Sequence, residues 1–238
     1  MTVIFRSPAQ HDVLRKENNI VLHFSRPMAA YSTSQLNGGI TKIKSCFNHQ
    51  LTEWIETVDD LPGGSIKNYL ITTALGLGLD WTAATGLITA ASMDMAAIKH
   101  VTYREMSLFA VITAGVDVNA VRAGETALYY EESYGKYVPA GGTINIFLIM
   151  EFFLPVESLA RVPIIVTEAK AAALQDLNVL SCFSGAVATG TGTDGLVAAC
   201  HREDHMKFSD VGTHSKLGEL IGSIVKRGII EALEQKKS

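Results

Sequence analysis

The hydrophobic and polar pattern of the first 25 residues predicts short β-strands at 3–5, 13–15 and 20–24, with a polar turn at 16–19. Four later segments are rich in β-branched and aromatic residues, which favour the pleated backbone of a strand. We therefore expect strands at 96–103, 108–113, 143–151 and 196–200. The segment 143–151 is the clearest of them.

Apolar residues at three- and four-residue steps predict three helices. The first begins at residue 65, the second covers 156–177, and the third runs from 213 to about 235. Since proline lacks the backbone N–H that a helix interior needs, we expect a kink or a break at Pro163 rather than one straight helix.

The remaining segments show no regular period. Residues 25–40 read as irregular and end in Asn-Gly-Gly at 37–39, a strong turn signal. The stretch 178–195 is rich in Ser, Gly and Thr, and 201–210 is polar, so we expect a loop at each.

Together these elements predict one α+β domain, with a mainly antiparallel sheet covered by about three helices. No linker divides the chain. Residues 61–100 and 154–201 both begin with Leu-Pro, continue as a helix and end in a Thr/Gly-containing strand. This similarity suggests a weak internal duplication.

Composition excludes several classes of protein. The 238 residues are 47% hydrophobic with a net charge of −4, so we expect no nucleic-acid partner. Neither a signal peptide nor a membrane span is recognisable. Three widely spaced cysteines without a C-x-x-C motif support neither a zinc ribbon nor a disulfide framework. We expect a cytoplasmic protein. Ile230 and Leu233 lie off the main apolar stripe of the last helix and suggest a possible homo-oligomer.

Residues 190–195, GTGTDG, match the G-x-G-x-x-G dinucleotide-binding pattern. That fingerprint needs a helix opening on its last glycine and a second parallel strand after it. Here the last glycine is followed by a short strand and a charged loop. The dinucleotide interpretation is therefore rejected. What remains is a loop of backbone N–H groups and threonine hydroxyls that ends at a carboxylate.

Six segments, in order, resemble the adenosylcobinamide amidohydrolase family: SQLNGGI (34–40), ITAGVDVNAVRAG (112–124), GTINIFL (142–148), TEAKAAALQDL (167–177), SGAVATGTGTD (184–194) and HSKLGELIG (214–222). They span most of the chain. Val116 and Asp117 stand where we would expect smaller residues, and 201–210 lies outside the matching segments.

The resemblance implies hydrolysis of an amide. The family cleaves the bond between the aminopropanol arm and the corrin ring of adenosylcobinamide, which gives adenosylcobyric acid and 1-amino-2-propanol. The expected partner is therefore a small-molecule corrinoid substrate. No cofactor is predicted, and the metal requirement stays open.

Amide hydrolysis needs a base or nucleophile, an oxyanion donor and an acid for the leaving amine. His214, at the start of the last helix, is expected to be neutral and on the apolar side, as a general base or merely a cap. Asp194 could orient His214, hold a water or cap a turn. Thr191 and Thr193 are candidate donors or nucleophiles. Glu168 completes the catalytic set, although its helix face reads as solvated.

The substrate-binding candidates lie in or beside the matching segments. Arg122 could hold a carboxylate or form a surface ion pair. Gln175 could bind the amide-rich rim of a corrinoid. The full set is Asn37, Gly38, Asn119, Arg122, Asn145, Lys170, Gln175, Thr189, Gly190, Gly192 and Lys216.

Two alternatives stay open at this point. The same apolar cleft and glycine loops would suit a corrinoid-binding or carrier protein without hydrolysis. A metal cluster of His201, Asp204 and His205 is conceivable, but charged loops of this kind are usually solvated, and we read these histidines and His49 as ordinary exposed residues.

Overall fold

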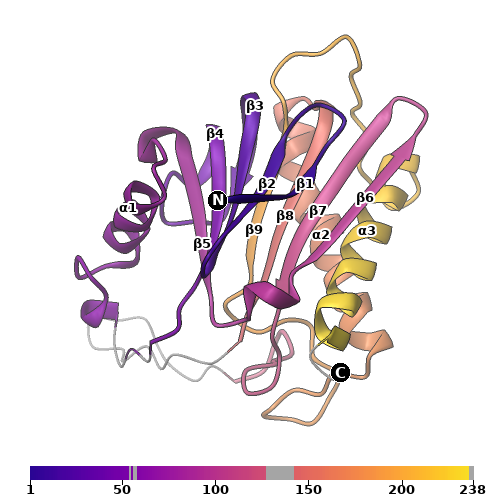
Figure 1. Cartoon of the computed structure of the whole chain (residues 1–238). Helices are drawn as coiled ribbons and strands as arrows, with labels where there is room; N and C mark the ends of the chain where they lie inside the picture. Colours follow the sequence, from indigo (N-terminus) through magenta and orange to yellow (C-terminus); the bar gives the residue numbers. More distant parts are fainter. Residues whose placement is uncertain (54, 56–57, 127–141, 236–238) are drawn as a thin grey trace.

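The computed structural model describes residues 1–53, 55, 58–126 and 142–235. In this part of the chain nine strands form one mixed sheet, and three α-helices lie against it (Figure 1). The strands are β1 (Thr2–Arg6), β2 (Asp12–Lys16), β3 (Asn19–Ser32), β4 (Gly39–Gln50), β5 (Ala84–Thr89), β6 (Ala97–Tyr103), β7 (Met106–Ala114), β8 (Ile144–Phe153) and β9 (Gly195–His201). The helices are α1 (Ile66–Gly76), α2 (Val156–Asp176) and α3 (Lys216–Glu234).

Six of the eight strand pairings are antiparallel, which confirms the predicted fold class. The main path is β1-β2-β3-β9-β8-β7-β6, with β4 paired to β3 and β5 paired to β4. Strand β3 makes this branch possible. Its first part pairs with β2 and β4, and its second part, from Met28 to Ser32, pairs with β4 and β9.

The two parallel pairs, β4–β5 and β8–β9, are each joined through an α-helix. Parallel neighbours need such a crossover connection, and α1 and α2 supply it. Both Leu-Pro segments noted in the sequence thus belong to β-α-β units. A shared local arrangement does not establish a duplication, which stays a prediction.

The sheet curls until it nearly closes on itself. Among the described strands β5 pairs with β4 alone, yet its C-terminal end, at Ile88, approaches β8. There the Nδ2 of Asn145 donates a hydrogen bond to the carbonyl oxygen of Ile88, 3.0 Å away. This contact brings the β4–β5 half of the sheet against the β7–β8 half.

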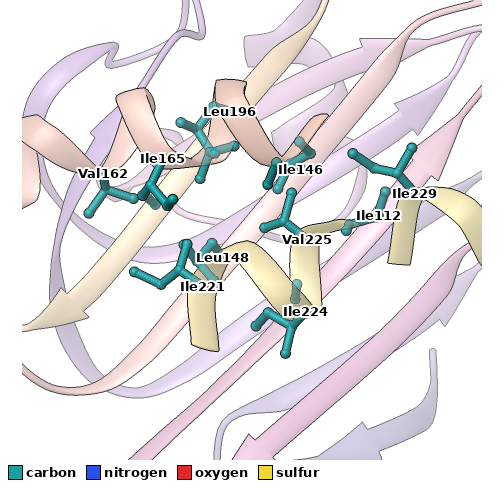
Figure 2. Close-up of a cluster of buried hydrophobic side chains, with 14 of the residues drawn as sticks. Ile112, Ile146, Leu148, Val162, Ile165, Leu196, Ile221, Ile224, Val225 and Ile229 are labelled. Atoms are coloured by element: carbon teal, nitrogen blue, oxygen red, sulfur yellow. The ribbon is translucent and has the colours of Figure 1, made fainter. Parts of the chain in front are cut away.

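Both faces of the central strands are buried. Ile146 and Leu148 of β8 pack against α2 and α3, in a cluster that Figure 2 shows from close by. Phe147 and Ile149, which alternate with them, belong to a second cluster inside the curled sheet. A strand buried on both faces has no polar side, so 143–151 reads as an almost continuous apolar run.

The helices have different roles in the core. Helices α2 and α3 pack on each other and cover one face of the sheet (Figure 1). Helix α1 lies over β4 and β5 with its own small apolar cluster, which contains Phe47, Leu70 and Leu77. It begins where Ser65 accepts a hydrogen bond from the N–H of Asn68. Among the described residues, no helix combines the length and hydropathy needed to cross a bilayer.

All seven predicted strands and three predicted helices are present, but one prediction fails. Strand β3 continues to Ser32 through the segment predicted to be irregular, because the backbone of residues 28–32 pairs with β4 on one side and β9 on the other. The pairing is interrupted only between His23 and Met28, around Pro27. Helix α2 runs through Pro163 without a break, whereas the alternative of a kink stays a prediction. The buried stripe on either side of Pro163, which includes Leu159 and Val166, holds the helix against the core.

Candidate functional site

A cavity of about 370 Å³ lies where the ends of β5 and β8 meet α1 and residues 189–195, which we call the Gly/Thr loop. One wall is apolar and consists of Leu51, Ile55, Val58, Leu61, Ile66, Leu70, Leu87 and Ile88. The polar side chains of the lining are Thr33, Ser34, Gln35, Glu53, Thr89, Thr143, Asn145, Thr193 and Asp194. A mainly apolar pocket with a few polar groups is typical of a small-molecule site.

Asp194 fixes the Gly/Thr loop to two other elements. Its Oδ1 accepts hydrogen bonds from Thr191 Oγ1 at 2.5 Å and from the N–H of Ile144 at 3.1 Å. Its Oδ2 accepts from the N–H of Thr191 at 3.2 Å and forms an ion pair with Lys170 Nζ of α2. A carboxylate has about four lone-pair sites, and all are used here. Asp194 therefore acts as an anchor of the loop rather than as a free base.

The glycines of this loop allow its backbone to wrap closely around the Asp194 carboxylate. A side chain on Gly190 would overlap Asp194 Oδ2 and lie 2.9 Å from Lys170 Nζ. Gly192 has a φ of +78°, in the left-handed region that glycine adopts without strain. The G-x-G-x-x-G pattern thus arises from a loop wrapped around a carboxylate. No helix opens on its last glycine, since Gly195 begins β9.

The threonines of the loop divide into three environments. Thr193 is exposed in the cavity, and its Oγ1 donates to Thr143 Oγ1 at 3.0 Å. Thr191 is 3% exposed, and its hydroxyl is engaged with Asp194. Thr189 Oγ1 accepts the N–H of Ala123 at 2.8 Å and lies outside the cavity lining. Of the three loop threonines, Thr193 alone lines the cavity.

Two buried amides, those of Asn145 and Asn48, lie at the cavity wall and directly behind it. Asn145, 1% exposed, donates to Ile88 O and to Asn48 Oδ1, and Asn48 donates to Thr113 Oγ1. Asn145 was among the residues predicted from the sequence, whereas Asn48 and Thr113 were not. An asparagine inside an apolar strand was the one signal in the sequence, because a buried amide needs hydrogen-bond partners and so indicates further polar residues nearby.

Glu53 was also missed. Its side chain lines the cavity, and no hydrogen bond or ion pair joins it to another residue in the described part of the chain. Its negative charge acts together with burial to raise the pKa of Tyr69, burial being the larger cause. Glu53 is thus a carboxylate in the cavity lining whose oxygens are not engaged by any residue that the structure describes.

The structure does not bring His214 to the Gly/Thr loop. Its side chain is 83% exposed, and Nε2 lies 3.4 Å from Asp210 Oδ2. The predicted inward orientation is wrong because α3 begins at Lys216, after the N-cap Ser215, so the helical period does not extend back to residue 214. His214 lines a separate hollow of about 190 Å³ with Arg161 and the exposed Glu168.

Asn37 and Gly38 stabilise the turn between β3 and β4. Asn37 has a φ of +51°, and its Nδ2 donates to the carbonyl oxygens of Trp81 and Ala84, each 2.7 Å away. A side chain on Gly38 would overlap the carbonyl oxygen of Ser34. Both lie outside the cavity lining, although Ser34 is part of it.

The other binding candidates are spread over the surface or used in packing. Asn119 is 3% exposed and donates to Gly142 O, which ties its loop to the cavity rim. Arg122 donates to Val187 O at 2.9 Å. Gln175 is exposed on α2. Lys216 pairs with Glu219 on the surface.

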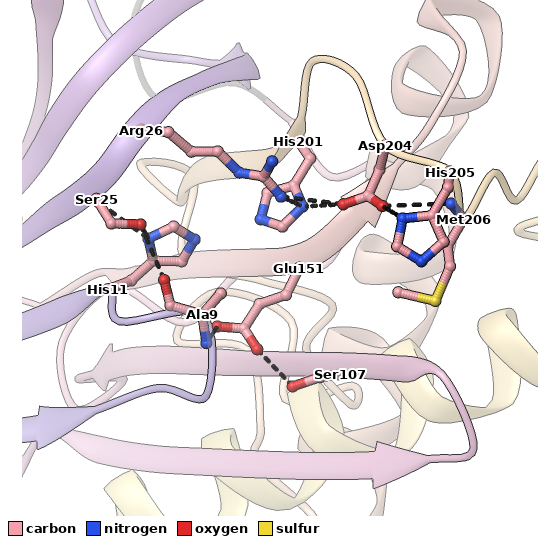
Figure 3. A network of polar contacts seen from close by, with 10 residues as sticks. All are labelled: Ala9, His11, Ser25, Arg26, Ser107, Glu151, His201, Asp204, His205 and Met206. Atoms are coloured by element: carbon pink, nitrogen blue, oxygen red, sulfur yellow. Dashed lines mark hydrogen bonds and ion pairs between the residues drawn. The ribbon is translucent and has the colours of Figure 1, made fainter.

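A second polar cluster lies at the other ends of β8 and β9 (Figure 3). His201, 2% exposed, hydrogen bonds through Nδ1 to Asp204 Oδ2 at 2.8 Å. Asp204 also accepts from Arg26 at 3.0 Å and contacts the exposed His205. The prediction that His201 is exposed is wrong, because β9 carries it into the core. Among the described residues, no group of three or more ligands could hold a metal ion.

Burial and hydrogen bonds shift the pKa values in this cluster. Burial lowers the pKa of His11 to about 4, and it also lowers the pKa of His201. Burial acts to raise the pKa of Asp204, but hydrogen bonds from His201, from the N–H of Met206 and from Arg26 outweigh it and lower the pKa to about 2. This end of the sheet thus buries two neutral histidines, His11 and His201, close to the ionised Asp204.

Comparison with known proteins gave matches of three kinds: a family model, a relative in sequence and solved structures. A family model described as adenosylcobinamide amidohydrolase matches residues 3–238. An uncharacterized protein of Methanocaldococcus jannaschii is 32% identical over 232 residues, which cover 93% of this chain and 88% of that protein. The crystal structure of a Pyrococcus horikoshii OT3 protein superposes with a TM-score of 0.46 at 12% identity, covering 98% of this chain and 80% of that one.

Proposed function

Because this chain belongs to the adenosylcobinamide amidohydrolase family, we propose that it hydrolyses the amide bond between the aminopropanol arm and the corrin ring of adenosylcobinamide. The products are adenosylcobyric acid and 1-amino-2-propanol. The proposed site is the cavity beside the Gly/Thr loop.

The observation that carries this proposal is the combination of size and lining of the cavity. At about 370 Å³ it holds a side arm but not a corrin macrocycle with all its substituents. The arm would enter with its methyl group against Leu70 and Ile88, and the scissile amide would reach Thr143 and Thr193. The macrocycle would stay at the mouth.

We assign Glu53 as the proton-transferring group. In the proposed step its carboxylate takes a proton from a water molecule while the water oxygen bonds to the amide carbon. The carbon–nitrogen bond then breaks, and the nitrogen receives that proton from Glu53. The net change adds one water molecule to the amide. The hydroxyl of Thr193 has a single proton, which in the free protein it donates to Thr143 Oγ1. In the proposed step this hydroxyl rotates and donates to the carbonyl oxygen instead, as negative charge develops there.

Lys170 and Asp194 are positioning residues in this proposal. They hold the loop that carries Thr193 without contacting the reacting atoms. His214 and Glu168 have no part, because both line the other hollow.

The test is to incubate the purified protein with adenosylcobinamide and to assay 1-amino-2-propanol, with and without a chelator. Release of the amine is expected. Chelator sensitivity would add a metal to the scheme and would contradict Glu53 acting alone on water. Absence of the amine together with a higher melting temperature in the presence of the corrinoid would instead support a binding or carrier protein.

A further inference from the structure

The amide of Asn145 has a single possible orientation. Its Nδ2 lies 3.0 Å from the carbonyl oxygen of Ile88. A backbone carbonyl only accepts hydrogen bonds, so the nitrogen and not the oxygen of the amide faces Ile88. The same nitrogen lies 2.8 Å from Asn48, which must therefore present its Oδ1.

The neighbouring groups support this orientation. With Oδ1 turned toward Asn145, Asn48 donates through Nδ2 to Thr113 Oγ1 at 2.8 Å. The chain of bonds joins β5, β8, β4 and β7 at the point where the sheet nearly closes. Both N–H groups of Asn145 are consequently used inside the protein.

The oxygen of Asn145 is left for another partner. No hydrogen bond from a residue in the described part of the chain reaches its Oδ1. A side chain on Gly195 would lie 2.6 Å from this oxygen and 2.8 Å from Leu87 Cδ1, so the glycine leaves the space beside Oδ1 open. Asn145 and Gly195 both line the cavity. Because Asn145 belongs to the cavity lining, a ligand that fills the cavity would displace water from this oxygen and would have to supply a donor in its place.

From this geometry we infer that Asn145 Oδ1 accepts a hydrogen bond from the N–H of the scissile amide and thereby selects amides over esters. The inference rests on the proposed function, since it names what the same cavity recognises. The fixed orientation matters because a free asparagine could rotate its amide to offer a donor instead. Asn145 cannot do so without leaving Ile88 O and Asn48 Oδ1 unpaired.

An ester places an oxygen where the amide has its N–H. Two oxygens with lone pairs would then face each other, and Oδ1 would stay without a donor. A site built to bind an N–H rejects an analogue that lacks it far more strongly than an apolar pocket rejects a change of size. Asn145 is therefore a specificity-determining residue.

The test compares adenosylcobinamide with the analogue in which an ester oxygen replaces the amide N–H. kcat/KM is measured for both compounds with the wild type and with Asn145→Ala. The amide-to-ester ratio is expected to fall about tenfold to a hundredfold in the variant, the range for a buried group that loses its partner. Because the ester never used Oδ1, general disturbance of the site affects both compounds and leaves the ratio unchanged.

Asn119→Ala is the matched control. It removes a buried amide that donates to Gly142 O at the cavity rim but belongs to no bond of the Asn145 network, so the ratio should equal that of the wild type. An unchanged ratio in Asn145→Ala, with a wild type that releases the amine, overturns the inference while the proposed function stands. If the wild type cleaves neither compound, the proposed function fails. The dissociation constants of the two compounds then decide, and an equal affinity ratio in wild type and Asn145→Ala overturns the inference as well.

Discussion

Lys170 and Asp194 form an ion pair whose side chains are only 13% and 15% exposed, and it joins helix α2 to the Gly/Thr loop. The two residues are 24 positions apart, and nothing in the sequence marks them as partners. Because Asp194 also accepts from Ile144 N, the pair connects α2, β8 and the start of β9. The position of Thr193 in the cavity depends on this connection.

Replacing Lys170 with methionine should destabilise the fold by about 3 kcal/mol, because Asp194 would stay mostly buried without its cation. Urea unfolding measures the change in free energy. The control is Lys226→Met, which breaks an ion pair with Asp176 whose side chains are 37% and 51% exposed. Such a surface pair contributes about 0–1 kcal/mol. Equal losses in the two variants would contradict the role given to Lys170.

Gly190→Ala should lower both stability and turnover, because the added carbon would overlap Asp194 Oδ2 and separate it from Lys170. Thermal unfolding and amine release measure the two effects. Gly185→Ala serves as the control: its φ is +71°, but the space around it is open. We expect it to cost about 1 kcal/mol through backbone strain and to leave turnover unchanged. Normal turnover in Gly190→Ala would show that the loop tolerates the overlap.

Glu53→Gln should reduce turnover of adenosylcobinamide about 100-fold or more, since an amide cannot take a proton from water. The unfolding midpoint should stay unchanged, because Glu53 is exposed and makes no hydrogen bond with a described residue. His214→Ala is the informative control. It should keep the wild-type kcat/KM, given that His214 is 83% exposed beside the other hollow. Loss of turnover in His214→Ala alone would restore the assignment made from the sequence.

Stability should fall as the pH drops from about 6.5 to about 4. The folded state holds His11 with a pKa of about 4, whereas the unfolded chain has the ordinary value of 6.5. Between these values the unfolded state binds more protons, so acidification favours unfolding, by on the order of 3 kcal/mol for the whole window. Asp204, with its pKa lowered to about 2, adds a further loss as the pH falls below 3.8.

The measurement is urea unfolding at a series of pH values between 7 and 4. The stability of His11→Phe should depend less on pH in this window, because the variant lacks the His11 imidazole. Some dependence should remain, because burial also lowers the pKa of His201. His23→Gln is the control for the substitution itself, since it replaces an exposed histidine of β3 that lies outside the buried cluster. An equal slope in His11→Phe and wild type would rule out His11 as the titrating group.

Much of the secondary structure follows from the sequence alone. The strands at 96–103 and 143–151 and the last helix were predictable because their residues satisfy a local period that burial enforces. The family was also recognisable, since six segments of unusual composition occur in the family's order. The rejection of a dinucleotide site needed only the order of elements after Gly195.

Tertiary pairing decided what the local period could not. Strand β3 extends through polar residues such as Ser32 because β4 and β9 supply its hydrogen-bond partners from distant parts of the chain. The orientation of His214 depended on where α3 begins, and that start is fixed by a serine cap and not by apolar spacing.

The candidate site is the clearest case of this division. The sequence determined that Asp194, Lys170 and Asn145 are present in segments typical of the family. Only the fold decided that Lys170 faces Asp194 and that Asn145 faces Ile88, because these contacts join strands and a helix that are remote in sequence. Hydrogen-bond partners at such separations leave no local pattern, so their consequences for the chemistry of the cavity appear only once the chain is folded.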